Sequence, residues 1–161
     1  MKLLVIEADP EISGLISLAF CVGRPKTEII AVSSADCGVE LACDAGVDLV
    51  VVDLGLEHKS GFKVIRDIRL YSKVPMIVVA DLNTRNLVSD AMKLGANECL
   101  VKPFELMEIL GKVCGLVEKK GIKYQQHPLP DENKVKQSPP KYVGFVQKGQ
   151  KPKTDWVGTF S

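Results

Sequence analysis

Short apolar runs alternate along the chain with longer segments in which apolar residues recur every three or four positions. The runs Val47–Asp53 and Val74–Ala80 are rich in β-branched residues and too short for ordinary helices. Between them, Phe62, Ile65 and Ile68 have the spacing of one helical face. The alternation therefore predicts strands and helices in regular succession.

Five strands and five helices follow from this pattern. The strands are predicted at Lys2–Glu7, Thr27–Val32, Val47–Asp53, Val74–Ala80 and Glu98–Lys102. The first helix is predicted to begin at Pro10, after Asp9 as its cap. The next three are predicted from Ser34 to about Ala45, over 61–71, and over 84–94, where Gly95 ends the helix. The last is predicted from Leu106 to Val117. Strictly alternating strands and helices predict an α/β fold with a doubly wound parallel sheet.

Chemically useful residues lie where the predicted strands end. Glu7, Asp53, Ala80 and Lys102 each close a strand. Ligands of doubly wound sheets bind beyond the carboxyl ends of the strands. We therefore expect these four positions to surround one cleft, although they are far apart in sequence.

Four stretches of the chain resemble the receiver domain of bacterial response regulators over residues Met1 to about Val117. They are Leu4–Pro10 (LVIEADP), Val47–Gly61 (VDLVVVDLGLEHKSG), Val74–Ala80 and Gly95–Phe104 (GANECLVKPF), the last being the most specific. The resemblance implies a flavodoxin-like (βα)5 fold with strand order 2-1-3-4-5. It also implies a histidine kinase that phosphorylates an aspartate, with a metal ion as cofactor.

The resemblance assigns roles to four residues. Asp53 takes the position of the phosphoacceptor, with its carboxylate as the nucleophile. Lys102 pairs with Asp53 or with its phosphate through a point charge. Glu7 matches the first of two acidic residues, and the backbone carbonyl of Gly55 lies where the family supplies a metal ligand. A Mg²⁺ site would thus involve Glu7, Asp53 and Gly55.

Three positions depart from the family pattern. Ala8 replaces the second acidic residue, a main Mg²⁺ ligand, so we expect weak or no metal binding. Ala80 replaces the hydroxyl residue that binds a phosphoryl oxygen. Cys99 replaces the aromatic residue whose movement carries the signal to the surface.

These departures predict an atypical cytoplasmic receiver with a degenerate site. It would signal through protein–protein contacts, largely without phosphorylation, and would not be an enzyme, since no glycine-rich phosphate loop follows any strand. Its expected partners are a histidine kinase or an output protein. Two alternatives stay open: an ordinary stand-alone response regulator phosphorylated on Asp53, and a DNA-associated regulator. Asp53 could also be a purely structural partner of Lys102.

Charge divides the chain into two parts. Residues 1–118 hold 12 Lys and Arg against 17 Asp and Glu, whereas residues 119–161 hold 9 Lys against 3 acidic residues. We therefore expect a receiver domain over 1–118 and a basic, proline-containing tail over 119–161. A β-hairpin is possible over 141–160 within this tail. The tail's charge alone would support only weak, salt-sensitive binding to nucleic acid.

Cysteine content and hydropathy limit the setting of the protein. Five scattered cysteines, with no Cys-x-x-Cys pair, argue against a disulfide framework and for a reducing compartment. No stretch approaches the roughly 20 apolar residues of a membrane span. The first apolar run, Leu3 to Ile6, is followed at once by acids, so no signal peptide is expected.

Self-association is expected on one face. Many receivers dimerise through the fourth helix, the fifth strand and the fifth helix, which here correspond to residues 84–94, 98–102 and 106–117. This face would carry Lys93, Asn97, Glu98, Glu105 and Glu108, with apolar residues between them. We expect a homodimer through it that does not require phosphorylation.

Overall fold

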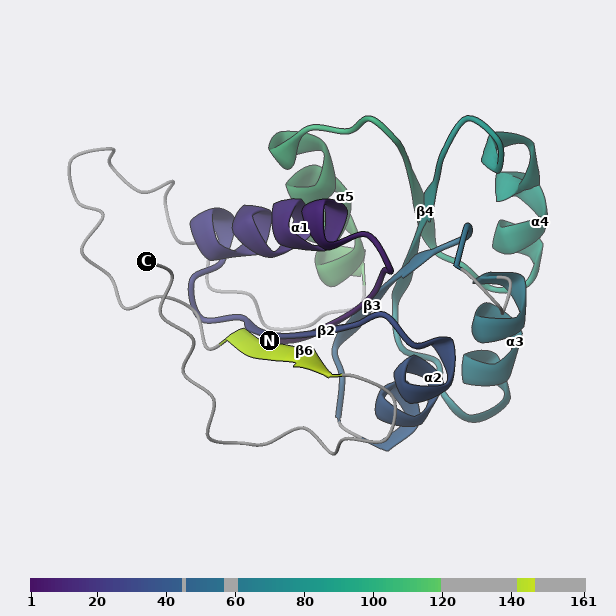
Figure 1. The fold of residues 1–161 in the computed structure, drawn as a ribbon, viewed down its shortest axis with the longest axis horizontal. Coiled ribbons are helices and arrows are strands. Elements are labelled where there is room, and N and C mark those ends of the chain that lie inside the picture. Colours follow the sequence, from purple (N-terminus) through teal and green to yellow (C-terminus); the bar gives the residue numbers. More distant parts are fainter. Residues whose placement is uncertain (45, 57–60, 120–141, 147–161) are drawn as a thin grey trace.

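A parallel sheet with helices on both faces forms the centre of the molecule (Figure 1). The computed structural model describes residues 1–44, 46–56, 61–119 and 142–146. The strands are β1 (Lys2–Ile6), β2 (Glu28–Val32), β3 (Leu49–Asp53), β4 (Met76–Ala80), β5 (Glu98–Val101) and β6 (Tyr142–Val146). They lie in the order β5-β4-β3-β1-β2-β6, and every pair is parallel. The predicted fold class and the predicted order of the first five strands are confirmed.

The helices form two layers. They are α1 (Pro10–Gly23), α2 (Ala35–Asp44), α3 (Gly61–Tyr71), α4 (Val88–Lys93) and α5 (Leu106–Lys119). A short 3₁₀ turn, η1 (Arg85–Leu87), replaces the first turn of the helix predicted over 84–94. Helices α1 and α5 cover one face of the sheet, and α2, α3 and α4 cover the other (Figure 1).

Alternation along the strands divides the core between these two layers. On β1, Leu3 and Val5 pack towards α1 and α5, whereas Leu4 and Ile6 pack towards α2, α3 and α4. All four side chains are fully buried. Because both faces of the central strands are covered, those strands must be apolar at every position, which explains the valine run in β3. The packing on both faces therefore fixes the residues at the carboxyl ends of the strands.

Strand β6 lies in the part of the chain that was expected to be a tail. It pairs in parallel with β2, with Tyr142 opposite Ile29 and Val146 opposite Val32. The predicted hairpin over 141–160 would have joined this segment to an antiparallel neighbour, and that second arm lies outside the described residues. Within the described ranges, no helix has the length and apolarity needed to cross a membrane.

Arg69 connects three elements at the edge of the sheet opposite the cleft. Its guanidinium donates twice to the carbonyl oxygen of Gly95, at 2.9 and 2.8 Å, and also to the carbonyls of Ser72 and Val74. It donates to Asn97 Oδ1 as well, which in turn accepts from the backbone amide of Met76. The end of α3 is thereby tied to the starts of β4 and β5.

We expect Arg69→Ala to lower the free energy of unfolding by about 2–4 kcal/mol, because half-buried carbonyls lose charge-assisted hydrogen bonds. Arg69→Lys should lose about 1–2 kcal/mol, since an ammonium cannot reach acceptors spread around a planar guanidinium. Urea denaturation of both variants measures this. Arg66→Ala, an exposed position on the same helix, is the control and should change stability by less than about 0.5 kcal/mol. Equal losses at the two arginines would contradict the assignment.

Candidate functional site

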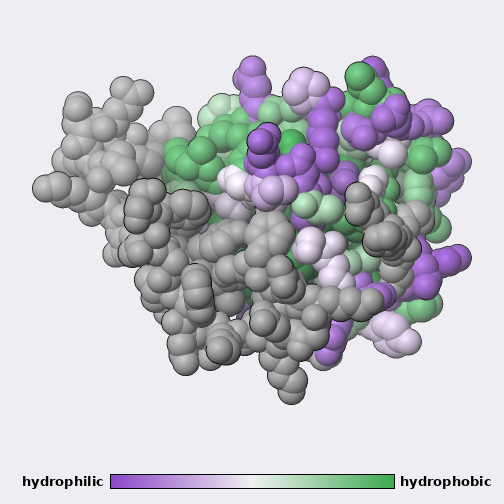
Figure 2. Space-filling view, viewed as in Figure 1, coloured by the Kyte–Doolittle hydropathy of each residue, from purple (hydrophilic) through white to green (hydrophobic). Residues whose placement is uncertain are grey.

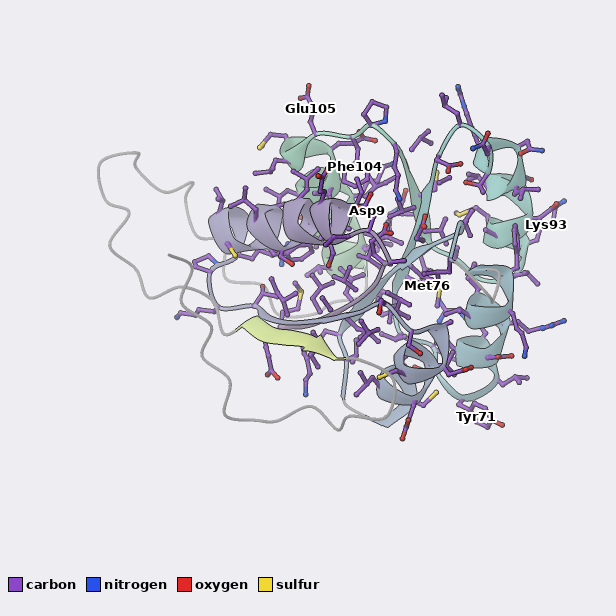
Figure 3. The ribbon with its side chains drawn as sticks, viewed as in Figure 1. Asp9, Tyr71, Met76, Lys93, Phe104 and Glu105 are labelled. Atoms are coloured by element: carbon purple, nitrogen blue, oxygen red, sulfur yellow. The ribbon has the colours of Figure 1, made fainter. Side chains whose placement is uncertain are left out.

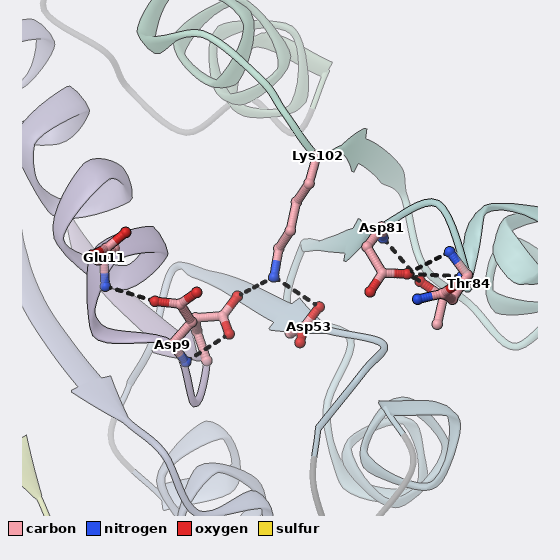
Figure 4. Close-up of polar contacts among 8 residues, drawn as sticks. Asp9, Glu11, Asp53, Asp81, Thr84 and Lys102 are labelled. Carbon is pink, nitrogen blue, oxygen red and sulfur yellow. Dashed lines mark hydrogen bonds and ion pairs between the residues drawn. The ribbon is translucent and has the colours of Figure 1, made fainter.

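Three charged side chains meet beyond the carboxyl ends of β1, β3 and β5 (Figure 4). The ammonium of Lys102 lies 3.0 Å from Glu7 Oε2 and 3.5 Å from Asp53 Oδ1. Glu7 and Asp53 are both buried, and Lys102 is partly buried. The structure thus brings together Glu7, Asp53 and Lys102, three of the four strand-end residues that were predicted to meet.

Local backbone structure fixes the first carboxylate. Glu7 immediately follows β1, and its amide continues the ladder by donating to the carbonyl of Val32. Its Oε1 accepts from the backbone amide of Asp9 at 3.0 Å, so both carboxylate oxygens have partners. Asp9 itself caps α1 by accepting from the amide of Glu11 at 2.8 Å, as the sequence predicted.

Burial and charge oppose each other in the triad formed by Glu7, Asp53 and Lys102. Desolvation by burial, followed by the charge of Asp53, raises the pKa of Glu7 above its usual value despite hydrogen bonds from Asp9 and Lys102. Burial also opposes the charge of Lys102, but the hydrogen bond and charge of Glu7, together with Asp53, outweigh it and raise the pKa of Lys102. Lys102 is therefore the cation that makes two neighbouring buried carboxylates tolerable.

Two glycines leave space around Asp53. A Cβ on Gly61 would lie 2.5 Å from the carbonyl oxygen of Asp53 and 2.6 Å from Leu54 Cα, so the start of α3 can approach β3 only with glycine there. A Cβ on Gly55 would lie 3.3 Å from Asp53 Oδ2. The backbone of Gly55 therefore lies directly beside the Asp53 carboxylate.

The three departures from the family pattern lie in different surroundings. Ala8 is exposed immediately after Glu7, whereas Ala80 is fully buried at the end of β4. The carbonyl of Ala80 accepts from the amide of Lys102 at 2.7 Å, so the ends of β4 and β5 are joined directly. Cys99 is partly buried against the core under α2, α3 and α4, on the side of the sheet away from α1 and α5.

Asp81 and Thr84 belong to the same edge of the sheet and were not predicted to take part. Asp81 Oδ1 accepts from the amides of Asn83 and Thr84 and from the Thr84 hydroxyl, while the Asp81 amide donates to Thr84 Oγ1 at 2.9 Å. The bond from the Thr84 amide contributes most to lowering the pKa of Asp81, and the charge of Lys102 adds to it. The pattern Asp-x-x-Thr directly after a strand is the sequence signal that could have indicated this turn.

The side chains around Asp53 fit a magnesium site poorly. Both Glu7 oxygens are engaged, and Lys102 contacts Asp53 Oδ1. Among the described residues, no three His, Cys, Asp or Glu side chains are grouped to hold a metal ion. The ammonium of Lys102 thus contacts the same two carboxylates that a divalent cation at this site would need as ligands.

This fold matches that of solved receiver domains. A two-component response regulator from Clostridium difficile superposes with a TM-score of 0.68 at 18% identity, over 74% of this chain and 98% of that structure. The receiver domain of TorR, the response regulator of the TMAO respiratory system, superposes with a TM-score of 0.66 at 23% identity, over 73% of this chain and 97% of that one. At these identities the likeness supports the fold alone.

The sequence profile of the response regulator receiver domain matches residues 3–114, and the chain belongs to this family of two-component signalling domains. It is 28% identical over 115 residues to the transcriptional regulatory protein KdpE of Staphylococcus aureus, covering 70% of this chain and 48% of KdpE. It is 32% identical over 125 residues to the probable transcriptional regulatory protein SilR of Salmonella typhimurium, covering 74% of this chain and 52% of SilR. The chain spans about half the length of these relatives.

Replacing Lys102 by Met should raise the pKa of Glu7 further, because the hydrogen bond and charge of Lys102 hold it down. A carboxyl whose folded pKa is raised loses stability as pH rises from its unfolded value of 4.5 through the raised pKa. Lys102→Met should therefore cost about 1–3 kcal/mol at neutral pH and less near pH 4, where Glu7 is protonated. Carboxyl carbon NMR and urea denaturation at several pH values measure both effects.

Lys112→Met is the matched control, since Lys112 contacts Glu98 at 3.7 Å at the start of β5, with more exposure than the contact of Lys102 with Glu7. Its cost should stay below about 1 kcal/mol and vary little with pH. A pH-independent loss in Lys102→Met, equal to that of the control, would show that the triad does not carry the expected charge balance.

Proposed function

We propose that the chain is an atypical receiver that passes signals through protein–protein contacts, with phosphorylation of Asp53 at most a secondary switch. One observation carries the proposal: Lys102 is already bound by Glu7 at 3.0 Å and by Asp53 at 3.5 Å. In this state the ammonium has its counter-charges without a phosphoryl group. Its partners would be a histidine kinase or an output protein.

The neighbouring positions support the same proposal. At Ala8 no carboxylate is available to draw a divalent cation into the cleft, and at Ala80 no hydroxyl is available for a phosphoryl oxygen. Cys99 has neither the size nor the ring that a rotating aromatic switch requires. Metal binding, phosphoryl binding and propagation would each be weakened by a separate substitution.

An ordinary response regulator phosphorylated on Asp53 is the second candidate. Gly55 has no side chain beside the Asp53 carboxylate, and Lys102 is close enough to contact a phosphoryl group there. Receiver domains of this family commonly use Mg²⁺ at this position. The two candidates differ in whether Mg²⁺ and a phosphoryl mimic bind together.

The domain organisation is also a proposal. We infer a receiver over 1–118 and a basic tail over 119–161, whose strand β6 covers the outer edge of β2. The chain's curated relatives are named transcriptional regulators, so a DNA-associated role for the tail remains a third candidate. It would require binding that disappears when salt is added and when residues 119–161 are removed.

For assembly we propose a homodimer through α4, β5 and α5. Lys93 projects outwards from α4, and Glu105 lies exposed at the start of the α5 segment (Figure 3). Met92 and Leu94 are each 39% exposed on this face. Asn97 and Glu98 have contacts within the chain, to Arg69 and to Lys112 and Lys119, so the exposed apolar residues would contribute more than these two polar ones.

Titration of the natural chain with Mg²⁺ and beryllofluoride, a phosphoryl mimic, should produce only small NMR shifts around Asp53 and Lys102. Ala8→Asp should recover metal binding, because position 8 is exposed and a carboxylate fits there. Adding Ala80→Thr should then give stable binding of the mimic. Saturable shifts at millimolar concentrations or below in the natural chain would instead establish the ordinary response regulator.

Two controls separate chemistry from folding in this experiment. Ala8→Asn has nearly the size of Ala8→Asp without its charge and should bind metal much more weakly. Ala80 is fully buried, so a threonine there could cost about 1–3 kcal/mol by overpacking. Ala80→Ser, which adds a single oxygen, serves as a smaller replacement, and urea denaturation checks that each variant is folded.

Sedimentation equilibrium should detect a dimer of the unphosphorylated chain. Met92→Glu should weaken it at least tenfold, because a carboxylate would be buried in the proposed interface. Leu70→Glu, at a position 69% exposed near the end of α3, is the control and should leave the association unchanged. On the face shown in Figure 2, hydrophilic and hydrophobic residues are interspersed, so the variants are needed to locate the contact. A monomer at high protein concentration rules the interface out.

A further inference from the structure

Asp81 adds a third carboxylate to the edge of the sheet that holds Lys102. It directly follows β4, and Lys102 directly follows the neighbouring strand β5. The residues that precede them, Ala80 and Val101, are paired in the sheet. Figure 4 shows Asp81 on the side of Lys102 opposite to Asp9. The hydrogen bonds from Thr84 lower the pKa of Asp81 most, and the charge of the neighbouring Lys102 adds to them, so Asp81 is ionised at neutral pH.

The charges at this edge do not balance. Lys102 is the one cation among the described side chains of the triad and its neighbour, facing the carboxylates of Glu7, Asp53 and Asp81. Such an edge attracts cations and repels anions, because neighbouring charges act directly on any ion placed there. A phosphoryl group on Asp53 would add negative charge beside Lys102, where Asp81 already acts.

We propose that Asp81 is a specificity-determining residue that biases the cleft against phosphoryl and other anions and towards cations. The inference rests on the proposed phosphorylation-independent function and names the residue that enforces it. Ala8 and Ala80 only lack a carboxylate and a hydroxyl, whereas Asp81 adds a charge. It places a repelling charge next to the position where Ala80 offers no hydroxyl.

The structural role of Asp81 can be separated from its charge. The turn needs an oxygen that accepts from the amides of Asn83 and Thr84, and an asparagine side chain supplies that oxygen. Asp81→Asn therefore removes the charge and keeps the turn. Thr84→Val does the converse, because it removes two hydroxyl hydrogen bonds and leaves the Asp81 charge in place.

The first arm of the test uses Mn²⁺ and the otherwise natural chain. Paramagnetic broadening of amide signals near Asp53 reports even weak binding of Mn²⁺. Asp81→Asn should weaken it by roughly three- to tenfold at low salt, and by less when salt screens the charge. Thr84→Val should leave it within about twofold.

The second arm uses the anion. In an Ala8→Asp, Ala80→Thr background, at Mg²⁺ concentrations that saturate each variant, Asp81→Asn should tighten beryllofluoride binding by roughly three- to tenfold. Opposite signs in the two arms are the signature of a charge, since a loosened turn would weaken both. Unchanged or equally weakened binding in the two arms overturns the proposal.

The outcome is distinguishable from failure of the proposed function. If the natural chain itself binds beryllofluoride tightly, that function fails, and the effect of Asp81→Asn is then measured directly in the natural chain. If even the restored background does not bind the mimic, the Mn²⁺ arm decides alone. No weakening in Asp81→Asn then overturns the role of Asp81.

Discussion

The contact of one ammonium with two buried carboxylates is the constraint on which this site depends. Glu7 and Asp53 end adjacent strands, so the sheet forces their side chains together regardless of their mutual repulsion. An uncompensated pair of buried carboxylates would be costly, and one of them would be protonated. Lys102, at the end of β5, supplies the compensation, and its strand is held by its own backbone bond to Ala80.

A resident cation changes what a receiver cleft can do. Where a divalent ion needs several carboxylate oxygens, the ammonium of Lys102 already uses one oxygen of Glu7 and one of Asp53. Position 8 holds no acid beside Glu7, and Asp81 holds one at the end of β4, next to the strand that Lys102 follows. The family fold therefore carries a particular set of charges at the carboxyl ends of its strands, and these charges, more than the architecture, bear on its chemistry.

The sequence predicted the elements and the strand ends well, because they depend on local patterns. Apolar runs fixed the five strands, and Asp9 and Gly95 marked helix ends, with Gly95 adopting a φ of 112° that favours glycine. Convergence of Glu7, Asp53 and Lys102 followed from the topology alone.

Two of the features that the sequence did not predict depend on partners distant along the chain, and a third is a local turn. Asn97 was expected on an interface, but its Oδ1 is engaged by Arg69, 28 residues away, and by the amide of Met76. The turn made by Asp81 and Thr84 replaced the start of a helix because side-chain bonds to the backbone compete with helical ones. The parallel pairing of β6 with β2 joins segments more than a hundred residues apart, which no local pattern encodes.

Strand β6 has a consequence for the sheet as a template. With β6 in place, the outer side of β2 is paired along Ile29 to Val32, with a register shift between Ile30 and Ala31, so a strand from another chain cannot pair with β2 directly. Pairing β6 with β2 brings together segments more than a hundred residues apart, which costs conformational entropy. An edge strand also gains hydrogen bonds on one side only. We therefore expect β6 to open before the rest of the sheet, with faster amide exchange along the outer side of β2 than along β3. Strand β6 then protects β2, and its release would expose backbone groups on the outer side of β2 that can pair with a strand from another chain.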